Sequence, residues 1–193
     1  MYEYIKGDLV DLTPTYAVLD NGGIAYFLNI SINTYSRLSG VAVAQLFVHQ
    51  VVREDAHLLF GFIDKQEREM FRSLISVSGV GANTGRVMLS SLTASELQSA
   101  ILNSDVNTLK SVKGIGAKTA QRIIIELKDK LGKDVNMSEI LLPQNNTIKE
   151  EALSALVMLG FAKNAVTKVV DKIVSKEPNP TVESLIKMAL KQL

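Results

Sequence analysis

The first third of the chain is a succession of apolar runs and polar breaks. Short runs rich in Val, Ile, Tyr, Phe and Leu are separated by turn-forming residues, including Asp20-Asn-Gly-Gly23, which is typical of a hairpin. The pattern predicts strands at residues 2–12, 16–19, 24–32, 46–52 and 58–63. Five short strands in so few residues are typical of a small barrel of the oligonucleotide-binding (OB) type, although a fold alone establishes no function.

From residue 64 the apolar positions follow a helical period instead. Met70, Phe71 and Leu74 share one face of a first predicted helix. A longer apolar stripe marks the last helix of this region and comprises Ala120, Ile123, Ile124, Leu127 and Leu131. Thr93-Ala-Ser-Glu96 between them is a capping box, which predicts another helix start. Residues 64–132 are therefore expected to form an all-α domain.

The last third of the chain reads as a linker followed by a second helical unit. Residues 133–147 show no sustained period and are expected to form a flexible linker. Apolar spacing then predicts three helices at 148–159, 163–175 and 182–192. A small tethered unit with almost no net charge suits a protein partner better than DNA, so residues 148–193 are expected to dock a protein.

Two segments 35 positions apart have nearly the same sequence, Leu74-Ile-Ser-Val-Ser-Gly-Val-Gly81 and Leu109-Lys-Ser-Val-Lys-Gly-Ile-Gly116. Each has an apolar run, a Gly-β-branched-Gly turn and then a helical pattern. Glycine permits a tight turn that leaves the first amides of the next helix open, and these amides attract anions. One such turn is weak evidence, whereas two in register predict binding of a phosphate backbone at two points.

Aligning the repeats shows where their charges differ. Lys110, Lys113, Lys118 and Arg122 of the second copy stand opposite Ile75, Ser78, Asn83 and Val87 of the first. Arg86 partly compensates, opposite Gln121. We therefore expect the second turn to supply most of the Coulombic attraction and the first to depend more on backbone amides. The alternative is that these are solvated charges on helical packing units.

Charge and composition narrow the functional classes. Residues 1–63 carry a net charge of −3, residues 64–132 of +3 and residues 133–193 of +1, so the positive balance coincides with the glycine turns. The chain has no cysteine, no apolar run long enough to span a membrane and an acidic start unlike a signal peptide, so a cytoplasmic protein is expected. His49 and His57 lack a third ligand at metal-binding spacing, and no nucleotide-hydrolysis motif is present. No cofactor is expected.

Glu54 and Asp55 lie between the last two predicted strands, at the expected hairpin tip. The residues alone favour an ordinary polar turn. The other reading is that two adjacent carboxylates on a DNA-binding surface repel phosphates and shape the path of the strands.

Several motifs together resemble the RuvA family, the Holliday-junction-binding subunits of the bacterial branch migration complex. They are Val51-Val-Arg-Glu-Asp-Ala56, Leu58-Leu-Phe-Gly-Phe62, Gln66-Glu-Arg68, Gly79-Val-Gly81, Gly114-Ile-Gly-Ala-Lys-Thr-Ala-Gln-Arg122 and Glu126-Leu-Lys-Asp-Lys130. The resemblance spans the chain and implies an α+β multidomain fold. Its parts would be an OB-type barrel with an acidic hairpin at 1–63, a tandem helix-hairpin-helix domain at 64–132, a linker, and a small three-helix, ubiquitin-associated-like domain at 148–193.

The resemblance also implies a function in recombination and DNA repair. The subunit would be non-catalytic and would hold a four-way junction open and planar as a homotetramer, or as an octamer on DNA. Residues 148–193 would recruit the hexameric RuvB ATPase, and the RuvC resolvase would be a further partner. Glu54 and Asp55 match the family's acidic pin, which reverses the preference for a simple polar turn. The positions that would meet phosphates are Gly79, Val80, Gly81, Asn83, Gly114, Ile115, Gly116, Lys118, Thr119 and Arg122.

The first hairpin departs from the family pattern. It reads Gly79-Val-Gly-Ala-Asn-Thr-Gly-Arg86, where the family usually has Pro and Lys after the second glycine and Ala at position 85. Asn83 removes a charge, and a helical Gly85 costs roughly 0.5–1 kcal/mol relative to Ala. Weaker DNA contacts are therefore expected at this hairpin.

Two other functional classes remain. Helix-hairpin-helix modules also occur in DNA glycosylases, but these need a catalytic carboxylate, for which Asp129 and Asp134 are the nearby candidates. A single-strand binder would need aromatic side chains exposed on a basic groove, whereas Tyr26, Phe27 and Phe47 are expected in the core of an acidic domain.

Overall fold

The computed structural model describes residues 2–139, 144–175, 177 and 180–193. The chain divides into two compact units, Met1–Val135 and Asn136–Leu193, which are described separately.

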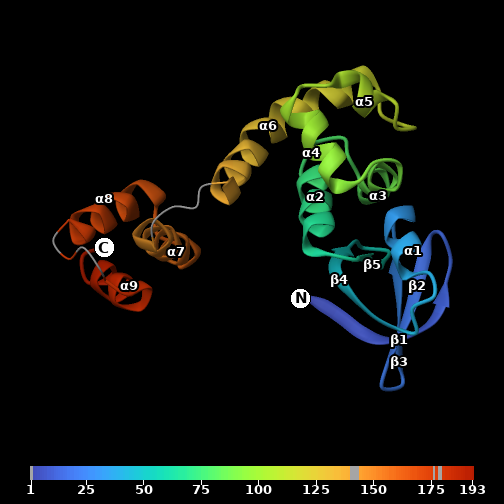
Figure 1. The fold of residues 1–193 in the computed structure, drawn as a ribbon, viewed down its shortest axis with the longest axis horizontal. Helices are drawn as coiled ribbons and strands as arrows, with labels where there is room; N and C mark the ends of the chain where they lie inside the picture. The colour runs from blue at the N-terminus through green and yellow to red at the C-terminus, as the bar shows by residue number, and fades with distance from the viewer. Residues whose placement is uncertain (1, 140–143, 176, 178–179) are drawn as a thin grey trace. The chain divides into compact units, whose positions relative to one another are not determined.

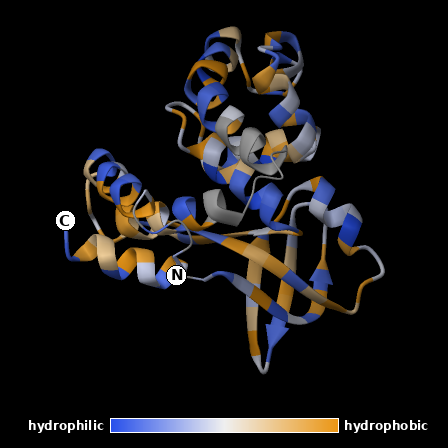
Figure 2. Ribbon diagram, turned by 60° about the vertical axis from the view of Figure 1, so that its left-hand side comes forward, coloured by the Kyte–Doolittle hydropathy of each residue, from blue (hydrophilic) through white to orange (hydrophobic). Residues whose placement is uncertain are grey.

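The first unit begins with a closed five-stranded barrel. Its strands are β1 (Tyr4–Leu12), β2 (Tyr16–Asn21), β3 (Ile24–Asn29), β4 (Val43–Val52) and β5 (His57–Phe62). They follow the order β1-β2-β3-β5-β4 around the barrel (Figure 1). The β3–β5 pairing is parallel and joins Asn29 to Phe60, and the other pairings are antiparallel. The predicted barrel is thus confirmed, and its strands carry both hydrophobic and hydrophilic residues (Figure 2).

The stretch between β3 and β4 was predicted incorrectly. The third strand ends at Asn29 instead of residue 32, and a helix, α1 (Ile32–Leu38), follows it. Ser31 caps this helix by accepting a hydrogen bond from the Thr34 amide. The cap outweighs the β-propensity of the preceding apolar run because it satisfies an amide that the helix leaves unpaired. β4 then begins at Val43, three residues before the predicted position.

Five helices complete the first unit, as the change in period predicted. They are α2 (Lys65–Ile75), α3 (Ala82–Ser91), α4 (Ala94–Leu102), α5 (Val106–Lys110) and α6 (Ala117–Glu139). The predicted capping box of α4 is present, with Thr93 and Glu96 each bonding the other's amide. The apolar stripe of α6 is buried, and it shares one core with Phe60 and Phe62 of the barrel. Barrel and helices are therefore joined through a common core.

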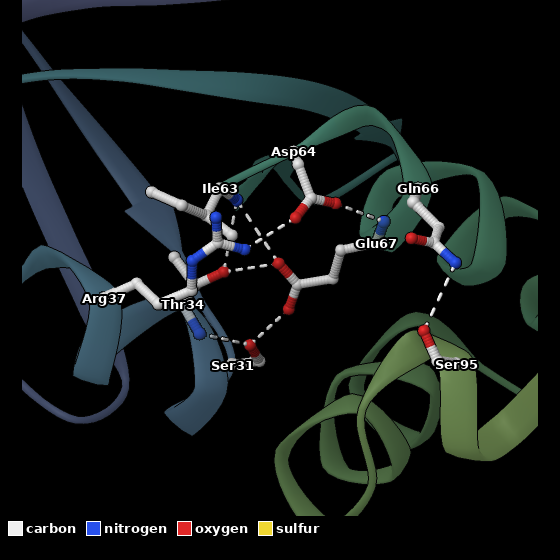
Figure 3. A network of polar contacts seen from close by, with 8 residues as sticks. All are labelled: Ser31, Thr34, Arg37, Ile63, Asp64, Gln66, Glu67 and Ser95. Carbon is white, nitrogen blue, oxygen red and sulfur yellow. Dashed lines mark hydrogen bonds and ion pairs between the residues drawn. The ribbon is translucent and has the colours of Figure 1, made fainter.

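Helix α2 is fixed to the barrel by a buried carboxylate. Glu67 is 5% exposed and accepts hydrogen bonds from the Ser31 and Thr34 hydroxyls and, at 3.2 Å, from the Ile63 amide (Figure 3). Asp64, which caps α2, also pairs with Arg37 at 2.6 Å. These contacts orient the helical domain on the barrel.

Arg68, the next residue along α2, makes a second buried connection. Its Nη1 donates to the Glu3 carbonyl at 2.9 Å and its Nη2 to the Glu3 carboxylate at 2.8 Å. The guanidinium also lies 5.4 Å from the centre of the Phe47 ring, a favourable cation–π distance. The hydrogen bond from Arg68 lowers the pKa of Glu3. The N-terminal strand is thereby tied to the helical domain.

The second unit contains α7 (Gln144–Met158), α8 (Lys163–Val174) and α9 (Val182–Leu190). Their core comprises Ala152, Leu156, Val166, Val170, Ile173, Leu185 and Ala189. Three helices were predicted, but α7 begins at Gln144 instead of residue 148, and α6 continues to Glu139 through the start of the predicted linker. Local sequence signals place helix ends less well than helix interiors, because the terminal turns of a helix fray. Residues 140–143 of the predicted linker lie outside the described residues.

Candidate nucleic-acid interface

The two glycine turns have the same backbone geometry. Gly79 and Gly114 have φ angles of +91° and +92°, a region that favours glycine. In each turn the residue after this glycine donates its amide to the carbonyl three positions back, Val80 to Val77 at 3.0 Å and Ile115 to Val112 at 3.1 Å. The sequence repeat is therefore a structural repeat.

Each turn leads directly into a helix whose first amides are available. α3 has Gly81 as its N-cap, with no side-chain cap, and α6 begins equivalently after Gly116. The first amides of a helix have no partner inside it, so they can donate to an anion. Both Gly81 and Gly116 are exposed, and a Cβ built on either would meet no atom within 4 Å. A phosphate can thus approach both turns closely.

The β-branched residue between the two glycines of each turn has a structural role. Val80 and Ile115 are 4% and 5% exposed, and their amides are already bonded within the turn. These two residues, predicted among the phosphate-contacting positions, are placed to hold the turn against the core. The residues that face solvent include the glycines of both turns, Asn83 on α3 and Ala117 at the start of α6.

The cations of the second hairpin are exposed, as the sequence indicated. Lys110, Lys113, Lys118 and Arg122 all face solvent, whereas Thr119 is half-buried. None of the four cations forms an ion pair within the part of the chain that the structure describes. Lys118, Arg122 and neighbouring residues of α6 line an open cavity of about 390 Å³. The second hairpin therefore presents uncompensated positive charge.

Arg86, expected to compensate for missing charge at the first hairpin, is directed to the barrel. Its Nη1 donates to the Thr15 carbonyl at 2.9 Å and lies 3.5 Å from the Asn29 side-chain oxygen. These acceptors are within reach because α3 packs on the barrel, and the charge compensation expected of Arg86 stays a prediction. Asn83 at the start of α3 is exposed and uncharged.

Glu54 and Asp55 occupy the tip of the β4–β5 hairpin, as predicted. The turn closes with the Arg53 amide donating to the Ala56 carbonyl at 2.8 Å. Both carboxylates are exposed, and neither has a salt-bridge partner among the described residues. The same compact unit therefore presents the two glycine turns and one acidic tip.

Comparison with known proteins gives the same order of barrel, helix-hairpin-helix region and C-terminal helical domain as the structure. Family models match residues 1–61 (RuvA N terminal domain), 71–129 (SAM-like helix-hairpin-helix tandem) and 147–193 (RuvA, C-terminal domain). A protein of Christiangramia forsetii is 52% identical over 193 residues and one of Flavobacterium psychrophilum 49%, each with full coverage of both chains. The chain belongs to the RuvA family. Both relatives, and one from Bacteroides fragilis that is 48% identical over 201 residues with both chains fully covered, are named Holliday junction branch migration complex subunit RuvA.

One aromatic side chain of this RuvA-family barrel is placed differently from expectation. Phe27, predicted in the core, is 53% exposed and stacks on Tyr16 with ring centres 4.5 Å apart. It lies outside because its neighbour in the strand, Leu28, takes the inward position. The Tyr16 hydroxyl donates to Asp11 at 3.0 Å, a bond that raises the pKa of Tyr16. The exposed pair thus sits beside a carboxylate, which disfavours a phosphate backbone there.

Other RuvA-family motif residues have structural roles that the sequence reasoning missed. Glu67 and Arg68 appeared only as part of a resemblance motif, yet they fix the helical domain to the barrel. Three ionisable residues in succession, Glu67 to Glu69, at the start of an amphipathic helix were the available signal. His49 is half-buried, and burial together with Arg72 lowers its pKa. Within the described residues there is no cluster of His, Asp or Glu suited to a metal, and no helix is long and apolar enough to cross a membrane.

Proposed function

We propose that this chain is the DNA-binding subunit of a branch migration complex and binds four-way DNA junctions without catalysing a reaction itself. The observation that carries the proposal is the pair of matched turns on one unit with an acidic hairpin tip. The relatives' names, which specify a Holliday junction branch migration complex, support the same reading.

The geometry suggests how each part contributes. The two turns donate backbone amides to phosphates, and Lys118 adds Coulombic attraction, so both would bind a duplex without reading its sequence. Glu54 and Asp55 would repel phosphates at the point where strands leave one duplex for another. Because Glu67 and Arg68 fix the barrel to the helices, the acidic tip is held at a defined place relative to the turns.

The proposed assembly extends beyond one chain. Four subunits would surround the four arms in an open, planar junction, as a homotetramer or a face-to-face octamer. Residues 148–193 would recruit the hexameric RuvB ATPase, with the RuvC resolvase as a further partner. Exposed apolar side chains on the second unit support docking of a protein, since Met158 is 86% and Leu159 62% exposed at the end of α7.

A competition gel shift tests the proposal. The full chain is mixed with a labelled four-way junction and either unlabelled junction or linear duplex of equal length, at one moderate salt concentration. We expect the junction to compete at least about tenfold better than the duplex, because only the junction engages all arms of an assembly. Equal competition by the two DNAs would contradict junction binding and leave a general duplex binder.

The acidic tip is tested with the isosteric change Glu54→Gln, Asp55→Asn. Removing two negative charges should leave junction affinity unchanged or higher, since the repulsion is lost. Unpairing at the crossover, read from the fluorescence of a 2-aminopurine placed there, should fall. Full unpairing in the variant would contradict the role proposed for the acidic tip.

A further inference from the structure

Arg122 belongs to the second hairpin by sequence but contacts the first. It lies on α6, six residues after Gly116. Its Nη1 donates to the Ser78 carbonyl at 3.1 Å, in the turn before α3. A Cβ built on Gly79 would lie 3.9 Å from the same nitrogen. The guanidinium therefore lies against the first glycine turn.

The first turn lacks a cation of its own. Asn83 stands where the second hairpin has Lys118, and Val87 stands where it has Arg122. Arg86 is turned toward the barrel, where its Nη1 contacts the Thr15 carbonyl and the Asn29 side chain. Within the described residues, Arg122 is the cation seen in contact with the first turn.

Arg122 has donors left for a ligand. A guanidinium carries five N–H groups, and one contact to Ser78 accounts for a single donor. Glu126, one helical turn along α6, forms no ion pair with it within the described residues. The side chain is exposed, so its remaining donors can reach a phosphate.

We propose that Arg122 completes the phosphate site of the first hairpin, while Lys118 serves the second. One side chain then both supplies the missing charge and fixes the spacing of the two turns. This inference rests on the proposed DNA binding. It concerns which cation contacts the phosphate at which hairpin, and it applies to linear duplex as well as to the arms of a junction.

A double-mutant cycle tests the assignment. The affinity of the full chain is measured by fluorescence anisotropy over a range of salt concentrations, for Arg122→Ala, Asn83→Lys and the combination. Arg122→Ala should weaken binding roughly tenfold and reduce the salt slope by about one unit. Asn83→Lys should restore most of this loss, and its gain should be larger in Arg122→Ala than in the unaltered chain, because a phosphate already neutralised gains little from a second cation.

Lys118→Ala is the matched control. It should also weaken binding roughly tenfold, yet in this background Asn83→Lys should give only the gain seen in the unaltered chain. Equal gains from Asn83→Lys in the unaltered chain and in Arg122→Ala would overturn the proposal. The cycle is run on linear duplex as well as on a junction, so that loss of junction preference contradicts the proposed function without obscuring the assignment of Arg122.

Amide exchange in the DNA-free protein tests the contact itself. Arg122→Ala should speed exchange of the Val80 amide in the first turn and leave that of Ile115 in the second unchanged, since only the first turn loses a partner. Arg122→Lys, which keeps the charge but not the planar donor group, should give the same exchange pattern with a smaller loss of affinity. Unchanged exchange at Val80 in both variants would contradict the bridging role.

Discussion

The two hairpins have the same turn but different surroundings. The first is bound to the barrel, because Arg86 of α3 bonds Thr15 and the Asn33 side chain of α1 donates to the Leu89 carbonyl at 2.6 Å. The second makes no side-chain hydrogen bond to the barrel among the described residues, and its cations face solvent. The first hairpin is thus held in place by the barrel, whereas the second carries the solvent-exposed positive charge.

This difference shows how a duplicated motif can separate two requirements. A DNA-binding surface needs a defined geometry, which calls for satisfied polar contacts between its parts. It also needs free charge, which is lost when a cation pairs within the protein. The first hairpin meets the former requirement and the second the latter, and Arg122 connects them.

The largest effect should follow from removing the carboxylate that fixes the first hairpin's leading helix. Glu67→Ala leaves the Ser31 and Thr34 hydroxyls without their acceptor and leaves the Ile63 amide only its 3.3 Å bond to the Thr34 hydroxyl. We expect the free energy of unfolding to fall by about 2–4 kcal/mol, measured by urea denaturation.

A matched control is Glu126→Ala on α6, where the carboxylate is exposed and has no ion pair among the described residues. It should change stability by less than about 0.5 kcal/mol. A similar small change for both variants would show that the first hairpin is not anchored through Glu67.

Much of this arrangement could be predicted from the sequence because its signals are local. The glycine repeat fixes both turns, since a positive φ at Gly79 and Gly114 depends on the residue itself. The apolar stripe of α6 and the capping box at Thr93 were equally local, and both are confirmed. The predicted phosphate contacts and the role of the acidic tip stay predictions.

Several contacts that the sequence did not reveal join residues far apart in the chain. Glu67 meets partners 33 and 36 residues earlier in the chain, and Arg122 meets a carbonyl 44 residues earlier. No local pattern reports such contacts. Phe27 was placed in the core from its side chain alone, whereas strand alternation turned it outward.

Exchanging glycine and alanine at the equivalent position of the two hairpins should have a smaller effect on stability than Glu67→Ala. Gly85 and Ala120 are equivalent in the repeat, and both are buried. Ala120→Gly should destabilise by about 1 kcal/mol, because glycine weakens a helix interior. Gly85→Ala should also destabilise, by about 1 kcal/mol, although alanine favours helix.

The reason is the packing around Gly85. A Cβ there would lie 3.2 Å from Ile75 and 3.3 Å from the Phe71 ring, which is held between Phe60 and Phe62. The sequence-based view that glycine simply costs stability at this position omits that close approach. Thermal unfolding of both variants provides the measurement, and a stabilised Gly85→Ala protein would show that Phe71 moves freely.

The smallest effect concerns the helix that precedes each turn. α2 has 11 residues, whereas α5 has five and depends on Asp105, whose carboxylate accepts from the Thr108 hydroxyl at 2.6 Å and from the Thr108 and Asn107 amides at 3.1 Å. The Thr108 hydroxyl, and then the two amides, lower the pKa of Asp105. A carboxyl with a lowered pKa in the folded state stabilises that state at pH values above the unfolded pKa, and this contribution is lost as the pH falls through the folded pKa.

Acid should therefore loosen the second hairpin at α5. The loosening would be seen as pH-dependent shifts of the Asn107 and Thr108 amide resonances with a midpoint below 3.8, the ordinary pKa of this carboxyl. Asp105→Asn should abolish that titration, and a midpoint at or above the ordinary value would show that the cap does not hold α5 in solution.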